Sequence, residues 1–167
     1  DQKIYHVAGS ATIEKNRFLE TSSKRKLFQN LSNDFIRINK KLEVKILSYL
    51  SKNIRKYDLV LVNDFGHGLL TEKIRNLIQK KSNYLALNCQ TNSSNVGYNF
   101  ISKYKSADHV TIDEPEARLS TQKRFAHIAE VIRVLKKQIT FKTCSITRGD
   151  EGSVIFEHKA KKYFNCP

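Results

Sequence analysis

The sequence predicts an α/β fold: a mostly parallel sheet flanked by helices. Short apolar runs of strand length alternate with longer segments of helical period. Each apolar run ends in polar residues or glycine, as loops at a ligand-binding sheet edge often do. The right-handed crossover rule places the loops that follow parallel strands at one edge of the sheet. We therefore expect four loops to lie together, those that follow Val62, Leu87, Thr111 and Thr147.

The first predicted element is a β-hairpin. Residues 12–20 and 25–29 are two extended, charged segments, and the polar residues between them suit a turn. Because neither segment has a continuous apolar face, we expect a hairpin over about residues 10–30 that stands off the main sheet.

The next elements alternate between helix and strand. We expect helices over 39–56, from Thr71, and over 94–104, the last capped by Asn92 or Ser93. The apolar run over 59–62 is typical of a parallel strand covered on both faces, and residues 84–87 form a second strand.

The second half of the chain begins with a strand that ends near Thr111, followed by an acidic corner. Asp113 suits a helix N-cap, Pro115 the first turn and Glu116 the third helical position. A helix is expected over 121–138, with Phe125, Ile128, Ala129, Ile132 and Leu135 facing inward. A strand over 143–147 and an antiparallel pair, 153–156 with 160–164, complete the predicted fold.

Length and composition restrict the class of protein. A chain of 167 residues suits one domain, and its three widely spaced cysteines suit reduced thiols in a cytoplasmic protein. A membrane span needs an apolar run of roughly 20 residues, and the sequence has no run of that length. No signal peptide is expected either. The net charge of +14 calls for an anionic partner. Nucleic acid is the weaker candidate, because the lysines are scattered and no RNA- or DNA-binding signature occurs.

The strand-end loops, taken with the hairpin, resemble the ribokinase-like (PfkB) sugar kinases, and most closely their heptose-phosphate kinase branch. Residues 63–71, N-D-F-G-H-G-L-L-T, are similar to that branch's S-D-Y-x-K-G-x-L-T segment. Residues 111–116, T-I-D-E-P-E, stand where the family has T-P-N-x-x-E, and residues 147–152, T-R-G-D-E-G, match its T-R-G-x-x-G. The hairpin resembles the family's β lid, with T-x-K-x-R-F followed by x-L-F-R.

The resemblance implies ATP and magnesium as cofactors and a sugar or sugar phosphate as the acceptor. It places ATP at Thr147, Arg148, Gly149 and Gly152, and magnesium near Glu116 and Asp113. The acceptor is expected near Asp64 and Gly66, together with the amides Asn88 and Gln90. It also implies a homodimer that forms through the lid.

The resemblance has two departures. Ile112 and Asp113 replace the family's Pro and Asn, and the chain resembles only the middle portion of the family's domain. The family's Gly-Gly sugar-binding segment would precede residue 1, and no segment like its D-T-x-G-A-G-D occurs in residues 1–167. We therefore expect residues 1–167 to be a single, incomplete kinase domain whose catalytic Asp lies beyond Pro167, with no catalytic residue of its own. Whether a nucleotidyltransferase domain is fused to it is left open.

Each candidate site also has a purely structural interpretation. Asp113 and Glu116 could serve only as helix-capping acids, and the two glycine-containing loops could be ordinary turns. Asn88 and Gln90 belong to a run of amides that could cap a helix. The rival function is a non-catalytic α/β module or a degenerate kinase domain that binds anionic ligands such as nucleotides or nucleic acid.

Overall fold

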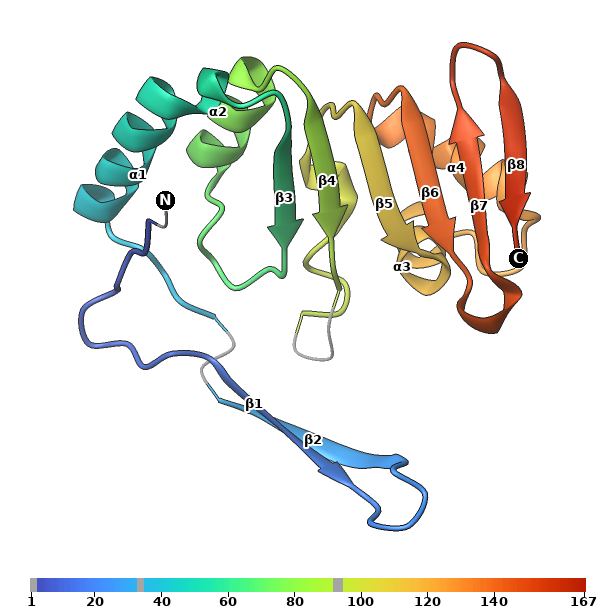
Figure 1. Cartoon of the computed structure of the whole chain (residues 1–167), viewed down its shortest axis with the longest axis horizontal. Helices are drawn as coiled ribbons and strands as arrows, with labels where there is room; N and C mark the ends of the chain where they lie inside the picture. Colours follow the sequence, from blue (N-terminus) through green and yellow to red (C-terminus); the bar gives the residue numbers. More distant parts are fainter. Residues whose placement is uncertain (1–2, 33–34, 92–94) are drawn as a thin grey trace.

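Two sheets organise the protein, a six-stranded sheet and a separate two-stranded hairpin (Figure 1). The computed structural model describes residues 3–32, 35–91 and 95–167. In the large sheet the strands lie in chain order: β3 (Val60–Asp64), β4 (Leu85–Cys89), β5 (His109–Asp113), β6 (Thr143–Thr147), β7 (Ser153–Glu157) and β8 (Lys162–Cys166). The pairs from β3 to β6 are parallel, and β7 and β8 are antiparallel additions. The predicted α/β class and mostly parallel sheet are confirmed.

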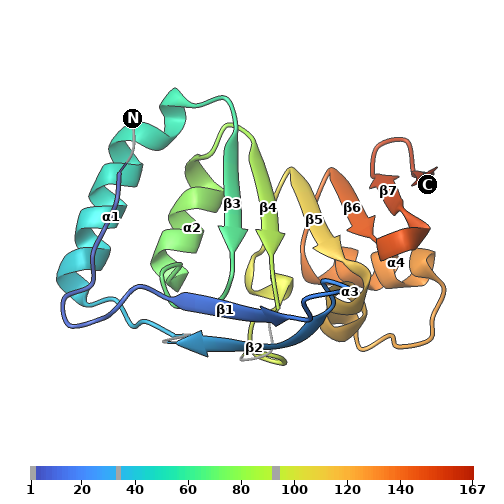
Figure 2. The same cartoon turned by 60° about the horizontal axis from the view of Figure 1, so that its bottom comes forward.

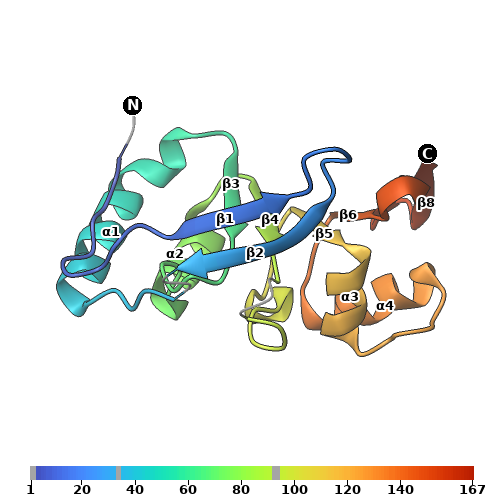
Figure 3. The same ribbon diagram turned by 90° about the horizontal axis from the view of Figure 1, so that it is seen from below.

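The hairpin consists of β1 (Glu14–Leu19) and β2 (Lys26–Ser32), paired antiparallel. Its strands are largely exposed, and Phe18 stacks on Phe28 with ring centroids 4.3 Å apart. The hairpin lies beyond the carboxyl edge of the parallel strands, and seen from below it passes in front of that edge (Figures 1 and 3). A hairpin that stands off the main sheet was predicted, and this is confirmed.

The core is a row of side chains that crosses the sheet at one level. Cα register joins five buried residues from strand to strand: Val62, Leu87, Val110, Cys144 and Phe156. They face the side on which α2 (Glu72–Lys81), α3 (Glu114–Thr121) and α4 (Ile128–Gln138) lie (Figure 3). Apolar side chains of these helices, among them Ile74, Ile78, Ile132 and Leu135, close the core.

The opposite face of the sheet is less covered. Leu61 points to that face and is 63% exposed, so the expectation that this strand is covered on both faces is wrong. The physical reason is that β3 is the edge strand of the sheet and α2, α3 and α4 pack on one side of it.

The first two helices follow the sequence prediction. α1 (Lys40–Asn53) continues into a 3₁₀ turn, η1 (Ile54–Lys56), and the Asn39 side chain caps its first turn by accepting from the Leu42 amide. α2 is capped by Thr71, whose hydroxyl accepts from the Ile74 amide. Both helices pack side by side at the β3 end of the sheet (Figure 2).

The prediction of a helix over 94–104 is wrong. Its described residues form turns and a 3₁₀ helix, η2 (Ile101–Lys103), and the predicted cap at Asn92 or Ser93 lies outside the described residues. Gly97 has a φ of +85°, and the Asn99 side chain donates to the carbonyls of Asp64 and Gln90. Side-chain amides that bond to neighbouring backbone compete with helix formation.

The prediction of one helix over 121–138 is wrong at its start, because the helix in the structure, α4, begins at Ile128. The chain forms α3, then a connection over 122–127, then α4, because Gln122 adopts a left-handed conformation with φ 56°. Phe125 lies in that connection and is 88% exposed, so its predicted inward position is wrong. Ile128, Ile132 and Leu135 are buried as predicted.

The helices formed by residues 3–32, 35–91 and 95–167 include none that is long and apolar enough to cross a membrane.

Candidate functional site

The parallel register brings the predicted site residues to one edge of the sheet. Asp64 pairs with Cys89 at the end of β3 and β4, and Asp113 pairs with Thr147 at the end of β5 and β6. The loops after these strands therefore leave the same edge, on the side where the hairpin lies (Figure 1). The predicted clustering of the loops is confirmed.

The acidic corner is a capping box at the start of α3. The Asp113 side chain accepts from the Glu116 amide at 2.7 Å, and Glu116 Oε2 accepts from the Asp113 amide at 3.2 Å. Glu116 Oε1 also accepts from the Thr91 amide at 2.8 Å. The Glu116 carboxylate thus ties the loop after β4 to the end of β5, and its burial raises its pKa, although the two backbone amides oppose the shift.

These contacts limit what Glu116 and Asp113 offer to magnesium. Each Glu116 oxygen already accepts one amide hydrogen, and the described residues contain no cluster of three or more His, Cys, Asp or Glu that is placed to hold a metal. Magnesium retains several waters and needs few carboxylates, so Glu116 fits a contact made through water better than direct coordination. Asp113 fits the capping role, as its structural interpretation predicted.

The loop after β6 contains Thr147, Arg148, Gly149 and Gly152. It is closed by backbone bonds from the Arg148 amide to the Gly152 carbonyl and from the Gly152 amide to the Gly149 carbonyl. A side chain at Gly152 would meet the Cys166 carbonyl at 2.1 Å, whereas the space around Gly149 is open. Gly149 can therefore allow a ligand to approach the backbone, and Gly152 is required by the packing of β8.

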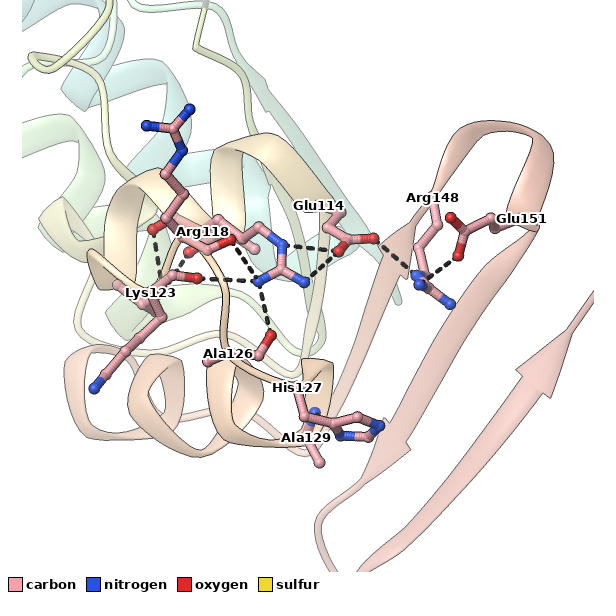
Figure 4. A network of polar contacts seen from close by, with 11 residues as sticks. Glu114, Arg118, Lys123, Ala126, His127, Ala129, Arg148 and Glu151 are labelled. Carbon is pink, nitrogen blue, oxygen red and sulfur yellow. Dashed lines mark hydrogen bonds and ion pairs between the residues drawn. The ribbon is translucent and has the colours of Figure 1, made fainter.

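Glu114 joins this loop to α3 (Figure 4). Its carboxylate accepts from Arg148 Nε at 2.8 Å and from Arg118 Nε and Nη2 at 2.8 and 2.6 Å. Arg148 and then Arg118 hold the pKa of Glu114 below its usual range, although burial opposes them. Arg148 also pairs with Glu151 at 2.5 Å.

Arg118 extends the network to the α3–α4 connection. Its Nη1 donates to the carbonyls of Lys123, Arg124 and Ala126 at 3.0, 3.1 and 2.8 Å (Figure 4). Sequence reasoning missed Glu114 and Arg118. Their i, i+4 spacing on one helix was the available signal for the ion pair.

A cleft of about 1060 Å³ lies between α3 and the loop after β6. We call it the α3 cleft. Its walls include Asp113, Glu114, Arg118, Leu119, Arg124, Thr147, Arg148 and Gly149. Three of the predicted nucleotide residues, Thr147, Arg148 and Gly149, thus line one concave surface, which carries two further arginines, Arg118 and Arg124.

The Asp64 loop is a tight turn with a buried carboxylate. Asp64 Oδ1 accepts from the Gly66 amide at 2.9 Å, and Oδ2 accepts from the Tyr104 hydroxyl and from Lys103 Nζ, both at 2.6 Å. Gly66 has a φ of +74°, and a side chain there would meet Asn95 Nδ2 at 2.3 Å. Asp64 and Gly66 therefore form the tight turn that their structural interpretation predicted.

The two predicted amides, Asn88 near the end of β4 and Gln90 just after it, differ in environment. Asn88 donates from Nδ2 to the Thr111 carbonyl at 3.0 Å and so joins β4 to β5. Gln90 uses its backbone amide to bond the Asp64 carbonyl at 2.9 Å, and its side chain is exposed. Gln90 is thus the better placed of the two to meet a ligand.

Solved structures of other proteins share this architecture. A ribokinase from Giardia lamblia superposes on 98% of the chain, covering 53% of its own, with a TM-score of 0.71 and 16% identity. The chain has the ribokinase-like fold. An Arabidopsis thaliana ribokinase complexed with ribose and ATP superposes on 93% of the chain and covers 48% of its own, with a TM-score of 0.61 and 14% identity.

Sequence similarity leads to the same group of proteins. The "Bifunctional protein HldE" of Aliarcobacter butzleri is 29% identical over 166 residues, which is 93% of this chain and 34% of the relative. The chain thus spans about a third of the length of the curated relatives it matches. No protein-family model matches it. The resemblance to ribokinase-like sugar kinases, in their heptose-phosphate branch, is confirmed by these relatives and the fold together.

Proposed function

We propose that this chain is part of a carbohydrate kinase that transfers the γ-phosphate of ATP to a hydroxyl of a sugar or sugar phosphate. The observation that supports this most is the meeting of three motif-bearing loops, those after β3, β5 and β6, at one edge of a ribokinase-like sheet. Phosphoryl transfer depends on positioning and on charge neutralisation, and this edge offers both amide donors and cations.

The α3 cleft is the proposed position of ATP. Gly149 leaves space for a phosphate to approach the backbone, and Arg148 presents a planar guanidinium at the same loop. Glu114 holds Arg148 in place, so the arginine is already oriented before a nucleotide arrives. Magnesium, when bound, neutralises charge on the phosphates, and Glu116 is positioned to hold one of its waters.

The hairpin is proposed to act as a lid over the acceptor. It lies beyond the carboxyl edge of the strands, where the acceptor would bind (Figure 3). Phe18, Leu19, Leu27 and Phe28 are between 47% and 62% exposed, an apolar surface that suits pairing with the hairpin of a second copy. We further propose a single kinase domain in a cytoplasmic protein.

The experiment uses a longer polypeptide from the same gene that contains residues 1–167. ADP formation is measured with ATP, magnesium and a panel of sugars and sugar phosphates, for the wild type, Glu116→Gln and the matched control Glu130→Gln. Glu130 lies on α4 in exposed ion pairs. We expect Glu116→Gln to lower kcat by roughly a hundredfold, in the range of other electrostatic contributions, and Glu130→Gln to leave it unchanged.

The rival function, a non-catalytic module that binds anionic ligands, has one specific observation in its favour. Asp113 replaces the family's Asn, and its carboxylate is engaged in the capping box. Nucleotide binding without acceptor-dependent ADP formation, across the whole panel, would favour this rival and contradict the kinase proposal.

A further inference from the structure

Much of the positive charge of the protein lies at the edge of the large sheet opposite the α3 cleft. Four segments lead into β3, β4, β5 and β6 at this edge, and the turn between β7 and β8 lies beside them (Figure 1). We call these segments, residues 55–59, 80–84, 105–108, 136–142 and 157–162, the basic edge. They contain eleven Lys or Arg against three Asp or Glu, which accounts for more than half of the net charge of +14.

Hydrogen bonds join the five segments of the basic edge into one continuous surface. Neighbouring strands lie about 4.8 Å apart, so this surface extends over roughly 24 Å from β3 to β8. Lysines that are far apart in the sequence therefore lie in one row. Across the sheet, the bonds run from Asn83 Nδ2 to the carbonyls of Arg55 and Tyr57, from the Asp108 amide to the Leu85 carbonyl, from the Lys142 amide to the Asp108 carbonyl and from the His158 amide to the Lys142 carbonyl.

Most cations of the basic edge have no acidic partner. Lys142 Nζ pairs with Asp108 Oδ1 at 2.7 Å, while Asp108 Oδ2 accepts from the Leu85 amide at 2.8 Å. Within residues 3–32, 35–91 and 95–167, no other cation of this edge forms an ion pair. Solvent ions therefore balance the other ten positive charges in the free protein. A polyanion that displaces these ions gains the free energy of their release.

Helix ends explain only part of this charge. α2 and α4 each end in a pair of lysines at the basic edge, residues 80–81 and 136–137, and cations complement the dipole at a helix C-terminus. The other lysines of the second half of the edge have no such reason to be there. They lie in loops, in the turn between β7 and β8 or at the start of β8: Lys105, Lys142, Lys159, Lys161 and Lys162.

Exposed tyrosines lie among these cations. Tyr57 and Tyr84 are both exposed, and Lys142 Nζ lies 5.9 Å from the centroid of the Tyr84 ring. Single-stranded nucleic acid is held by this combination, because cations follow its backbone while its bases stack on aromatic rings. The tyrosines therefore favour a partner that has both phosphates and unpaired bases.

The basic edge ends in a cavity of about 580 Å³ beside α4 and β8. Its walls include Arg133, Lys136, Lys161 and the exposed ring of Tyr163, with Glu130 as the acid among them. Cations and an aromatic face thus occur together a second time, in a concave surface. This repetition extends the same chemistry to the far end of the edge.

We propose that the basic edge binds single-stranded nucleic acid, with phosphates on its lysines and bases stacked on Tyr57 and Tyr84. In the sequence the lysines are scattered, and only the fold gathers them into a row. A duplex suits this surface less well, because its bases are already stacked. An anionic membrane also suits it less well, because interfacial binding needs an apolar face and Leu59 is the large exposed aliphatic side chain of this edge.

Fluorescence anisotropy of labelled oligonucleotides tests this with the 167-residue protein. The probes are single-stranded RNA and single-stranded DNA of about 12 nucleotides, a length that such sites accommodate, and a DNA duplex of the same length. We expect both single strands to bind and the duplex to bind more weakly than either. Saturating ADP should leave this binding unchanged, because the α3 cleft lies at the other end of five-residue strands, roughly 16 Å away.

A triple variant removes one exposed lysine from each of three segments: Lys80→Gln, Lys105→Gln and Lys159→Gln. Each phosphate contact contributes about 0.7 to the slope of log affinity against log salt for a single strand. The triple variant should therefore reduce this slope by about 2 and weaken binding about tenfold or more at roughly 0.1 M salt.

The matched control removes the same charge from the hairpin and from the start of α1. It carries Lys15→Gln, Lys40→Gln and Lys41→Gln, three exposed positions outside the basic edge. We expect its affinity and its salt slope to equal those of the wild type. Equal losses in the two triple variants would show that net charge alone holds the oligonucleotide, and would overturn the proposal.

Tyr57→Leu separates nucleic acid from other polyanions. Leucine keeps an apolar side chain but has no aromatic face, so oligonucleotide binding should weaken by about fivefold or more. Binding of heparin, a polyanion without bases, should not change. Unchanged oligonucleotide binding by Tyr57→Leu, displacement of the oligonucleotide by ADP, or tighter binding of anionic vesicles or polyglutamate than of either single strand would each overturn the proposal.

Discussion

Replacement of Arg118 by alanine should destabilise the protein by removing the clamp on the α3–α4 connection. Arg118 holds three backbone carbonyls, from Lys123, Arg124 and Ala126, and a two-point bond to Glu114. The connection is largely exposed, so water would replace the guanidinium at those carbonyls. Each such exchange costs about 0.5–1 kcal/mol.

The ion pair adds a smaller contribution. The Arg118 and Glu114 side chains are 23% and 17% exposed, so about 1 kcal/mol is appropriate after solvent screening. The total is about 3 kcal/mol. For a chain of this size each kcal/mol lowers Tm by about 2–4 °C, so Arg118→Ala should lower it by roughly 6–12 °C.

Urea denaturation followed by circular dichroism measures the change in the free energy of unfolding. Arg118→Lys retains the charge but lacks the planar fork, so its loss should be intermediate. The control is Arg133→Ala, because Arg133 is 62% exposed and its ion pair with Glu130 is a surface pair. A loss for Arg118→Ala within 0.5 kcal/mol of the Arg133→Ala value, roughly the scatter of surface substitutions, would refute the clamp.

Three further predictions concern the core, the acidic corner and activity. Leu87→Ala should lower the free energy of unfolding by about 2–5 kcal/mol, because Leu87 is 1% exposed in the buried row. The control Leu61→Ala, at a position 63% exposed, should lower it by less than about 1 kcal/mol. Similar losses for the two variants would contradict this assignment of the core. Because burial raises the pKa of Glu116, the stability linked to its protonation is present below the unfolded-state pKa and is lost as pH rises through the folded-state pKa. Between pH 4 and 7 the free energy of unfolding should therefore fall less steeply with rising pH for Glu116→Gln than for the wild type. Identical slopes for the two proteins would contradict a raised pKa at Glu116. Residues 1–167 alone, which contain no G-A-G-D segment, should show no turnover with ATP, magnesium and hexose or heptose phosphates. Turnover that Glu116→Gln abolishes would show that these residues form a complete catalytic site and would contradict the prediction.

Much of the fold was predictable because local patterns and tertiary packing agree. The segment over 143–147, in which Cys144 and Ile146 alternate with hydroxyl residues, became β6, and the D-x-x-E spacing of Asp113 and Glu116 became a capping box with the expected bonds. In both places the preference of the segment matches what the core requires. The same agreement placed the strand-end loops at one edge.

The errors occurred where side chains bond to distant backbone. Asn99 donates to carbonyls in the loops after β3 and β4, and these bonds outweigh the helical period of residues 94–104. Phe125 has helical spacing to Ile128 and Ile132 but lies beyond the left-handed Gln122, where no helix face exists. Periodicity does not reveal a break set by the conformation of one residue.

The site was predicted in position and less well in detail. Motifs located Arg148 and Gly149, but the bond from Arg148 to Glu114, which Arg118 also holds, became visible only when α3 and the loop after β6 were in place. Likewise Lys80 and Lys159 are 79 positions apart, as their residue numbers show, and only the fold brings them to one edge of the sheet.

The strand order of the large sheet, β3 to β8 in sequence, has a consequence for synthesis of the protein. A ribosome delivers residues at about 5–20 per second, N-terminal segments first. From β4 onward, the strand to which each new strand bonds has already been synthesised when the new strand emerges. The sheet can grow by adding each strand beside the one synthesised just before it, and no later strand has to insert between two strands that are already paired. Within this part of the chain, the edge to which the next strand is added is at each moment a single short strand of five residues, and β3, also five residues long, stays at the other edge throughout.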